Sequence, residues 1–253
     1  MSAQPAAAAL AAGCLACVVA GCGAIASAPP RTTPPITNPS IRPVSPEVQR
    51  AARLKLAPVA AASVHRAAEK MTVRVRNVNC EGISLGSGFA VAPHVLLTNR
   101  HVLAGANELA INTWDGHDAS VEAAIVGALG DLGIVETTES LPTVARFGRP
   151  AKAGDLVTVV GYPLGGPLTF ADGTVIDRVA GSHFGIGGSV LRLTANVEHG
   201  NSGGPVLDGE GRVVAVVFAI ETTTGFGLAI PIDTVASLIR AGGLESVPAC
   251  GAE

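Results

Sequence analysis

A glycine-rich turn around a single serine, residues 200–205, is the feature that most constrains the fold of this chain. Glycine allows backbone conformations and close approaches that a β-carbon would forbid. Such a turn can lift the Ser202 hydroxyl into solvent and aim backbone N–H groups at one point, which are two requirements of acyl transfer. All of its residue types also form ordinary turns. The run alone therefore leaves two interpretations open, a nucleophile and a plain turn.

A histidine and an aspartate upstream favour the nucleophile. His101 follows the apolar run 95–97, and Asp131 stands at the head of the apolar stretch 132–135. The order His, Asp, Ser along the chain is that of the chymotrypsin-type triad. Matching that template predicts His101 as the general base, Asp131 as the residue that orients it, and Ser202 as the nucleophile.

Asp155 is the alternative to Asp131. Both aspartates follow a glycine, precede an apolar run and lie between the histidine and the serine. The residues before Asp155, at 152–154, are typical of a plain turn that enters a strand. A buried carboxylate needs a partner, which His101 would supply to Asp131, and Gly133 leaves room for close packing there. We therefore favour Asp131.

Six blocks of residues occur in one order along the chain, and together they resemble the trypsin-like serine protease family, in its bacterial HtrA-type branch. The blocks are Gly86–Phe89, Thr98–Leu103, Asp131–Val135, Gly161–Pro163, Gly200–Pro205 and Gly225–Asp233. The resemblance covers about residues 71–240. It implies an all-β fold of two six-stranded antiparallel β-barrels, with the triad in the cleft between them.

The remaining elements are read from the sequence around that fold. Residues 47–70 are predicted to be helical, with a break at Pro58, and residues 234–240 form a terminal helix. The stretch 145–150 is expected to cross between the barrels, and residues 155–230 to make the second one. The protease domain would span residues 71–253, and the chain leaves no room after it for the PDZ domain that HtrA enzymes usually carry.

The resemblance also implies an oxyanion hole and a substrate pocket. The backbone N–H groups of Gly200 and Ser202 are the expected oxyanion donors. Asn196 falls where an acid gives trypsin its basic specificity, so we expect a preference for small or medium apolar P1 side chains. His199 either rims the pocket or is simply exposed. The residues expected to form the pocket are Asn196, His199, Phe218, Ala219 and Ile220.

Residues 1–28 are predicted to be an export signal, because an alanine-rich apolar run there fits an h-region and is too short for a convincing membrane span. Residues 19–22 resemble the bacterial lipoprotein processing box, in which Cys22 would be lipidated. No Lys or Arg precedes Arg31, so the usual positive n-region is missing. A plain signal-peptidase site at 24–26 stays open as the alternative.

A linker and one disulfide are expected beyond the signal. Seven prolines between residues 29 and 46 favour an extended, semi-rigid spacer, and the whole segment 29–70 is taken as linker and short helix. Cys80 and Cys250 are the only cysteines outside the signal, and an exported compartment permits a bridge between them. Such a bridge also resembles an actinobacterial membrane-anchored branch of the family.

Composition and motifs exclude several other functions. The net charge is −3 and no basic cluster occurs, so nucleic acid is not an expected partner. No metal-ligand cluster, phosphate loop or internal repeat is visible, and no cofactor is expected. The favoured function is an exported serine endopeptidase acting on proteins or peptides, on the outer face of the membrane or secreted. A latent protease or a catalytically silent scaffold for binding is the alternative, and the oligomeric state is left open.

Overall fold

The computed structural model describes residues 64–128 and 130–247, and all the structural statements below concern these residues. The export signal, Cys22, the proline-rich linker and Cys250 lie outside them. The two longer helices among the described residues are α2 (Val64–Met71) and α4 (Ile232–Ala241). The predicted helix 47–70 is thus described only at its end, whereas the predicted helix 234–240 is confirmed and begins two residues earlier.

Seven strands of the first half and one C-terminal strand form a single antiparallel sheet, in the order β14-β6-β7-β3-β2-β1-β4-β5. The strands are β1 (Thr72–Asn79), β2 (Gly82–Ala92), β3 (Val95–Thr98), β4 (Ala106–Asn112), β5 (Asp118–Ala119), β6 (Val121–Gly127), β7 (Gly133–Thr137) and β14 (Leu244–Ser246). Only Ser120 separates β5 from β6, so these two strands are the halves of one interrupted strand. In the order above, β5 lies at one end and β6 lies near the other end, next to β14. That continuity curls the sheet into the expected first barrel, to which β14 adds an edge strand.

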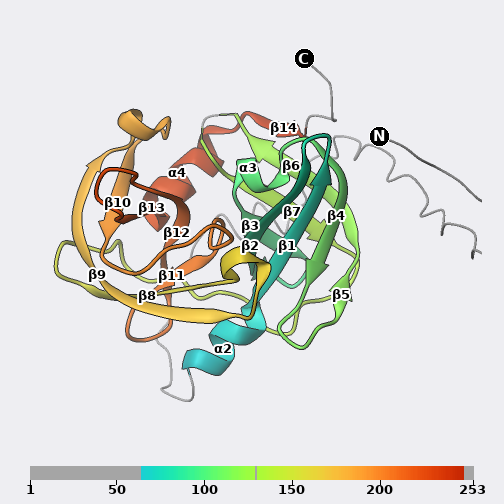
Figure 1. Cartoon of the computed structure of the whole chain (residues 1–253), viewed down its shortest axis with the longest axis horizontal. Coiled ribbons are helices and arrows are strands. Elements are labelled where there is room, and N and C mark those ends of the chain that lie inside the picture. Colours follow the sequence, from blue (N-terminus) through green and yellow to red (C-terminus); the bar gives the residue numbers. More distant parts are fainter. Residues whose placement is uncertain (1–63, 129, 248–253) are drawn as a thin grey trace, which may run out of the picture. The chain divides into compact units, whose positions relative to one another are not determined.

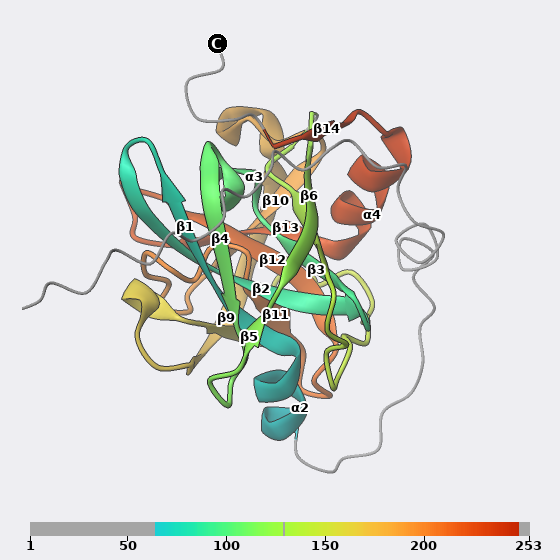
Figure 2. The same ribbon diagram turned by 90° about the vertical axis from the view of Figure 1, so that its right-hand side faces the viewer.

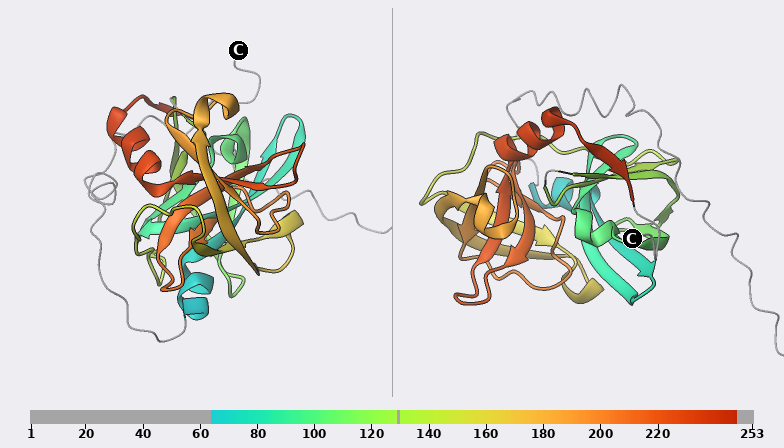
Figure 3. Two further views of the ribbon diagram at one scale, coloured as in Figure 1. Left: turned by 90° about the vertical axis from the view of Figure 1, so that its left-hand side faces the viewer. Right: turned by 90° about the horizontal axis from the view of Figure 1, so that it is seen from above.

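The second half forms a closed barrel of six strands, in the order β10-β13-β12-β11-β8-β9. Its strands are β8 (Leu156–Gly161), β9 (Thr169–Ala180), β10 (Ser189–Leu193), β11 (Pro205–Leu207), β12 (Val213–Ile220) and β13 (Gly227–Pro231). The prediction of a second barrel over residues 155–230 is therefore confirmed. The two barrels lie side by side, with α4 and α2 against them (Figures 1 and 3).

Three apolar clusters explain why the strands carry apolar residues on both faces. One cluster fills the first barrel, with Leu96 and Val135, and another fills the second barrel, with Val159 and Ala215. The third, which includes Leu97 and neighbours from both halves, packs the barrels against each other. Because side chains alternate along a strand, consecutive residues such as Leu96 and Leu97 serve two different cores.

The crossover between the barrels is anchored at both ends. The Ala145 N–H donates to the carbonyl of Ala90 in the first barrel at 2.7 Å, and Phe147 forms a parallel bridge with Val213 in the second. The expected crossover at 145–150 is confirmed. In α2, His65 is exposed, and its ring stacks on Phe170 of β9 at 4.4 Å between ring centroids.

Turns of the first barrel carry two further histidines and a cysteine. His117 lies in the hairpin turn before β5 and is exposed. His94, in the turn between β2 and β3, is half-buried, and its Nδ1 lies 3.1 Å from the carbonyl oxygen of Thr137. Cys80 lies exposed at the turn between β1 and β2. Its predicted bridge to Cys250 stays a prediction. Figure 2 shows β1, β4 and β6 of this barrel together.

Candidate active site

The histidine and aspartate singled out in the sequence are in direct contact. His101 lies in the short helix α3 (Arg100–Leu103) after β3, and Asp131 lies in the turn before β7. Nδ1 of His101 is 2.6 Å from Oδ2 of Asp131, and the His101 backbone N–H donates to Oδ1 at 2.9 Å. An ionised carboxylate can only accept hydrogen bonds, so Nδ1 carries the hydrogen in this pair. The neutral ring therefore keeps its lone pair on Nε2.

Close packing around Asp131 explains its position next to His101. Asn99, which is fully buried, donates from its side-chain amide to the Asp131 carbonyl at 2.8 Å. A β-carbon on Gly133 would lie 2.6 Å from the Leu103 side chain and 2.9 Å from the Asn99 carbonyl oxygen. The role predicted for Gly133, to leave room for close packing, is thus confirmed. The Asp131 side chain is 19% exposed and that of His101 is 48% exposed, so the ring remains open to solvent.

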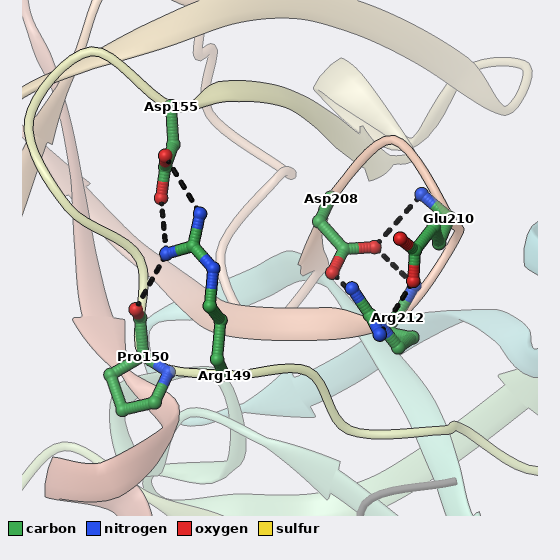
Figure 4. Close-up of polar contacts among 6 residues, drawn as sticks. All are labelled: Arg149, Pro150, Asp155, Asp208, Glu210 and Arg212. Atoms are coloured by element: carbon green, nitrogen blue, oxygen red, sulfur yellow. Dashed lines mark hydrogen bonds and ion pairs between the residues drawn. The ribbon is translucent and has the colours of Figure 1, made fainter. Parts of the chain in front are cut away.

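The competing aspartate is engaged elsewhere. Asp155 accepts two hydrogen bonds from the Arg149 guanidinium, at 2.8 and 2.9 Å (Figure 4). It accepts a third from the Lys152 N–H at 2.9 Å. The hydrogen bonds from Arg149 and the Lys152 N–H hold the pKa of the Asp155 carboxyl below its usual value. Asp155 therefore belongs to a surface turn of the second barrel, as the sequence indicated.

Ser87, which lies in one of the family blocks but was given no role from the sequence, connects the serine turn to both barrels. Its N–H donates to the carbonyl of Ser202 at 2.8 Å, and its hydroxyl donates to the carbonyl of Gly200 at 2.7 Å. The hydroxyl also accepts from the Tyr162 N–H at 2.9 Å, and the Ser87 carbonyl accepts from the Thr98 hydroxyl at 2.6 Å. These contacts join residues far apart in the sequence, so no local signal could have found them.

Gly203 is the position at which the turn needs a glycine most clearly. Its φ is +85°, and a β-carbon there would lie 2.1 Å from the Ser87 carbonyl oxygen and 2.3 Å from the Thr98 hydroxyl oxygen. The turn can approach β2 and β3 this closely only without a side chain.

We expect Gly203→Ala to lower the free energy of unfolding by about 3 kcal/mol or more, since left-handed strain and overpacking add. Urea unfolding of the variant measures this loss. Gly209→Ala is the matched control, because a β-carbon at Gly209 meets no atom within 4 Å. Equal unfolding midpoints for the two variants would contradict the steric argument.

The Ser202 hydroxyl donates to the carbonyl of Phe218 at 3.4 Å, which is long for an O–H···O hydrogen bond. Phe218 lies where the register of β12 against β13 shifts between Val217 and Ala219. Such a bulge re-aims the backbone locally and is common next to active sites. Within residues 64–128 and 130–247, no hydrogen bond joins the Ser202 hydroxyl to the His101 ring.

The carbonyl groups that precede Gly200 and Ser202 indicate where the backbone N–H groups of these two residues point. The His199 carbonyl accepts from the Leu164 N–H at 2.6 Å, and the Asn201 carbonyl accepts from the Gly204 N–H at 2.9 Å. In a planar trans peptide the N–H points opposite to the C=O, so the N–H groups of Gly200 and Ser202 point away from these contacts. Among the described residues neither N–H donates a hydrogen bond.

The other residues predicted for the pocket differ in exposure. Asn196 is exposed and donates to the Glu198 carboxylate at 3.0 Å, and His199 is exposed. The Phe218 side chain is buried and meets Phe184 at 6.4 Å between centroids, so only its backbone faces the serine. Ala219 and Ile220 are half-buried.

No cluster of three or more His, Cys, Asp or Glu in the described part of the chain could hold a metal ion. None of the helices described is both long enough and apolar enough to cross a membrane.

Comparison with known proteins groups this chain with serine proteases. Residues 86–216 match the family of the trypsin-like peptidase domain. The serine protease Rv3671c of Mycobacterium tuberculosis is 32% identical over 182 residues, which make up 64% of this chain and 44% of that protein. The serine protease Do-like HtrA of Bacillus subtilis is 31% identical over 153 residues, with 55% of this chain and 34% of that protein covered. The chain thus spans less than half the length of these curated relatives.

A solved structure supports the same grouping. The crystal structure of the active form of the Rv3671c protease from M. tuberculosis has a TM-score of 0.66 to this fold at 26% sequence identity. The similarity covers 79% of this chain and 95% of that one.

Proposed function

This chain belongs to the trypsin-like peptidase domain family and is homologous to HtrA-type serine proteases, and from that premise we propose that it is a serine endopeptidase. Ser202 is the nucleophile, His101 the general base and Asp131 the residue that orients the base. The observation that carries the proposal is the contact of His101 Nδ1 with Asp131 at 2.6 Å, which leaves Nε2 free to accept a proton.

The proposed reaction follows the triad mechanism. The Ser202 hydroxyl leaves its long contact with Phe218 and gives its proton to Nε2 of His101 while Oγ attacks the scissile carbonyl. The N–H groups of Gly200 and Ser202 hold the oxyanion of the tetrahedral intermediate. Protonated His101 then gives the proton to the leaving amine, and an acyl-enzyme remains. Water, activated by the same histidine, releases the acid.

Labelling with a fluorophosphonate probe tests the proposal directly. The purified protein should become labelled, and mass spectrometry should find the modification on the peptide that contains Ser202. Casein or an unstructured peptide should be cleaved in parallel. A folded protein that is neither labelled nor active would contradict the proposed activity.

A latent protease is the second candidate, and one observation favours it. The Ser202 hydroxyl bonds to the Phe218 carbonyl rather than to His101. Rotation about one side-chain bond would free the hydroxyl, because a 3.4 Å contact is weak. A latent form would be labelled only after an activating treatment such as acid, membranes or removal of the N-terminal segment. A silent binding scaffold would not be labelled under any of these conditions.

The proposed substrates are proteins or peptides with small or medium apolar P1 residues. Asn196 supplies no charge for a basic P1 residue, and this supports an uncharged pocket.

Profiling on a peptide library should therefore give kcat/KM values at least about tenfold higher for Ala or Val at P1 than for Lys or Arg. A dominant preference for Arg or Lys would exclude this pocket.

We also propose that the protein is exported. The proposal rests on the sequence of residues 1–28 and therefore on residues outside those described. Mass spectrometry of the mature N-terminus distinguishes the two routes: a lipid-modified Cys22 indicates a membrane-anchored lipoprotein, and an unmodified start after Ala26 indicates soluble secretion. The retained full-length N-terminus would contradict both.

A further inference from the structure

A turn with a strained backbone lies next to the serine turn. The 3₁₀ turn η1 (Pro163–Gly165) contains Leu164, the one non-glycine residue with positive φ among the residues described, at 54°. The residue is 69% exposed and gains little burial that would offset the strain. A left-handed conformation of a residue with a β-carbon costs free energy and persists only where its surroundings hold it.

The strained residue makes one contact that bears on catalysis. The Leu164 N–H donates to the His199 carbonyl at 2.6 Å. Because the peptide between His199 and Gly200 is planar and trans, this bond fixes the direction of the Gly200 N–H. If the peptide turned over, the His199 carbonyl would take the place of the N–H and repel an oxyanion. The orientation of one proposed oxyanion donor thus depends on the turn at 163–165.

Arg74 of β1 holds that turn from the opposite barrel. Its Nη1 donates to the Gly165 carbonyl at 2.9 Å, although the two residues are 91 positions apart. The guanidinium also lies 5.7 Å from the centre of the Tyr162 ring, and Nε donates to the Asn112 side chain at 3.4 Å. Figure 1 shows the turn, in yellow, beside β1 and β2.

The contacts of Arg74 indicate a geometric role. Within the described residues it forms no ion pair with a carboxylate, and its partners are a carbonyl, an amide and an aromatic ring. The planar guanidinium can bond the turn and cover the ring at once, which the ammonium of a lysine can do only in part. The turn's own bonds, from the N–H of Gly165 to Tyr162 and from that of Gly166 to Pro163, do not reach the first barrel.

We propose that Arg74 is a positioning residue for the oxyanion hole. It fixes the turn at 163–165, the turn fixes the His199 carbonyl, and the Gly200 N–H is thereby held toward the developing oxyanion. The inference rests on the proposed function, since it concerns the same reaction. Arg74 itself touches neither the substrate nor the reacting atoms.

Steady-state kinetics of Arg74→Met tests this role, because methionine keeps the apolar stem and removes the guanidinium. We expect kcat to fall roughly 10- to 100-fold, less than the 10²–10³ typical for outright loss of one oxyanion donor. KM should change by less than about threefold, because ground-state binding is not involved. The affinity of a peptide aldehyde, whose hemiacetal oxygen occupies the hole, should fall by the same factor as kcat. The midpoint of the pH–kcat/KM profile should stay in place, since Arg74 does not contact His101.

Two further variants separate positioning from general stability. Arg74→Lys should recover part of kcat, because the ammonium can still bond to the Gly165 carbonyl. Arg76→Ala, two residues along the same strand, should leave kcat and aldehyde affinity unchanged, since its side chain makes no hydrogen bond to any described residue. Thermal unfolding of each variant checks that it is folded at the assay temperature. If Arg74→Met is unfolded there, Arg74→Lys decides the question, with a reduced kcat at unchanged KM as the expected result.

The outcomes distinguish this inference from the proposed function. An active unmodified protein with an unchanged kcat in folded Arg74→Met would overturn the positioning role alone. A rise in KM at unchanged kcat would also overturn it, since it would assign Arg74 to substrate binding. An unmodified protein that neither hydrolyses peptides nor reacts with the fluorophosphonate would overturn the proposed function, and this inference with it.

Discussion

Replacing Ser202 with alanine should lower kcat by a factor of roughly 10⁶. A loss of this size is typical when a triad serine is removed, because only the oxyanion hole and substrate binding then remain to accelerate the reaction. The hydroxyl is the only group of this turn that can form an acyl-enzyme. Its loss removes the covalent step instead of weakening it. Hydrolysis of a peptide substrate, followed at high enzyme concentration, measures the residual rate.

The fold should not change with this substitution. The Ser202 hydroxyl makes one hydrogen bond, at 3.4 Å to Phe218, whereas the backbone of the turn is held through Ser87. We expect the unfolding temperature of Ser202→Ala to match that of the unmodified protein. Ser182→Ala, at an exposed serine of η2 (Gly181–Phe184), is the matched control and should keep full activity and full labelling. Retention of most of the activity by Ser202→Ala would exclude this serine as the nucleophile.

Much of the fold follows from the sequence because the strands are short apolar runs with alternating faces. The runs at 95–97 and 132–135 are read correctly, since every apolar side chain in them enters a core. The closure of the first barrel is not visible in the sequence. It depends on Ser120, which interrupts one strand whose two halves, β5 and β6, pair with β4 and β7 respectively.

The site shows the same division between local and long-range information. The choice of Asp131 over Asp155 could be made locally, because a turn sequence precedes one and a glycine with a packing role follows the other. The roles of Ser87, Leu164 and Arg74 could not, since each depends on a contact across 75 or more residues or on a backbone angle. The bulge at Phe218 is also a tertiary feature, because it exists only as a mismatch between β12 and β13.

The sharpest test of the base and its partner is Asp131→Asn, for which we expect kcat to fall by about 10⁴ at neutral pH. The size is that of the same change in the chymotrypsin-type triad. Asparagine can keep the hydrogen bond from the His101 N–H to its carbonyl oxygen, so the local geometry should survive. Its amide nitrogen can then donate to Nδ1, which would move the ring hydrogen to Nε2 and leave no lone pair for the serine proton. Stopped-time assays of peptide hydrolysis measure the loss.

Asp155→Asn is the matched control, because it makes the same chemical change in a carboxylate that bonds Arg149 and not His101. We expect full activity, and only a small loss of stability, since exposed ion pairs contribute little. The sign of its pH dependence is fixed by Arg149, whose hydrogen bonds lower the pKa of the Asp155 carboxyl. The stabilisation is therefore present above the ordinary aspartate pKa and is lost as acid protonates the group. The stability difference between Asp155→Asn and the unmodified protein should thus vanish in acid, while equal losses of kcat in the two variants would refute the assignment of Asp131.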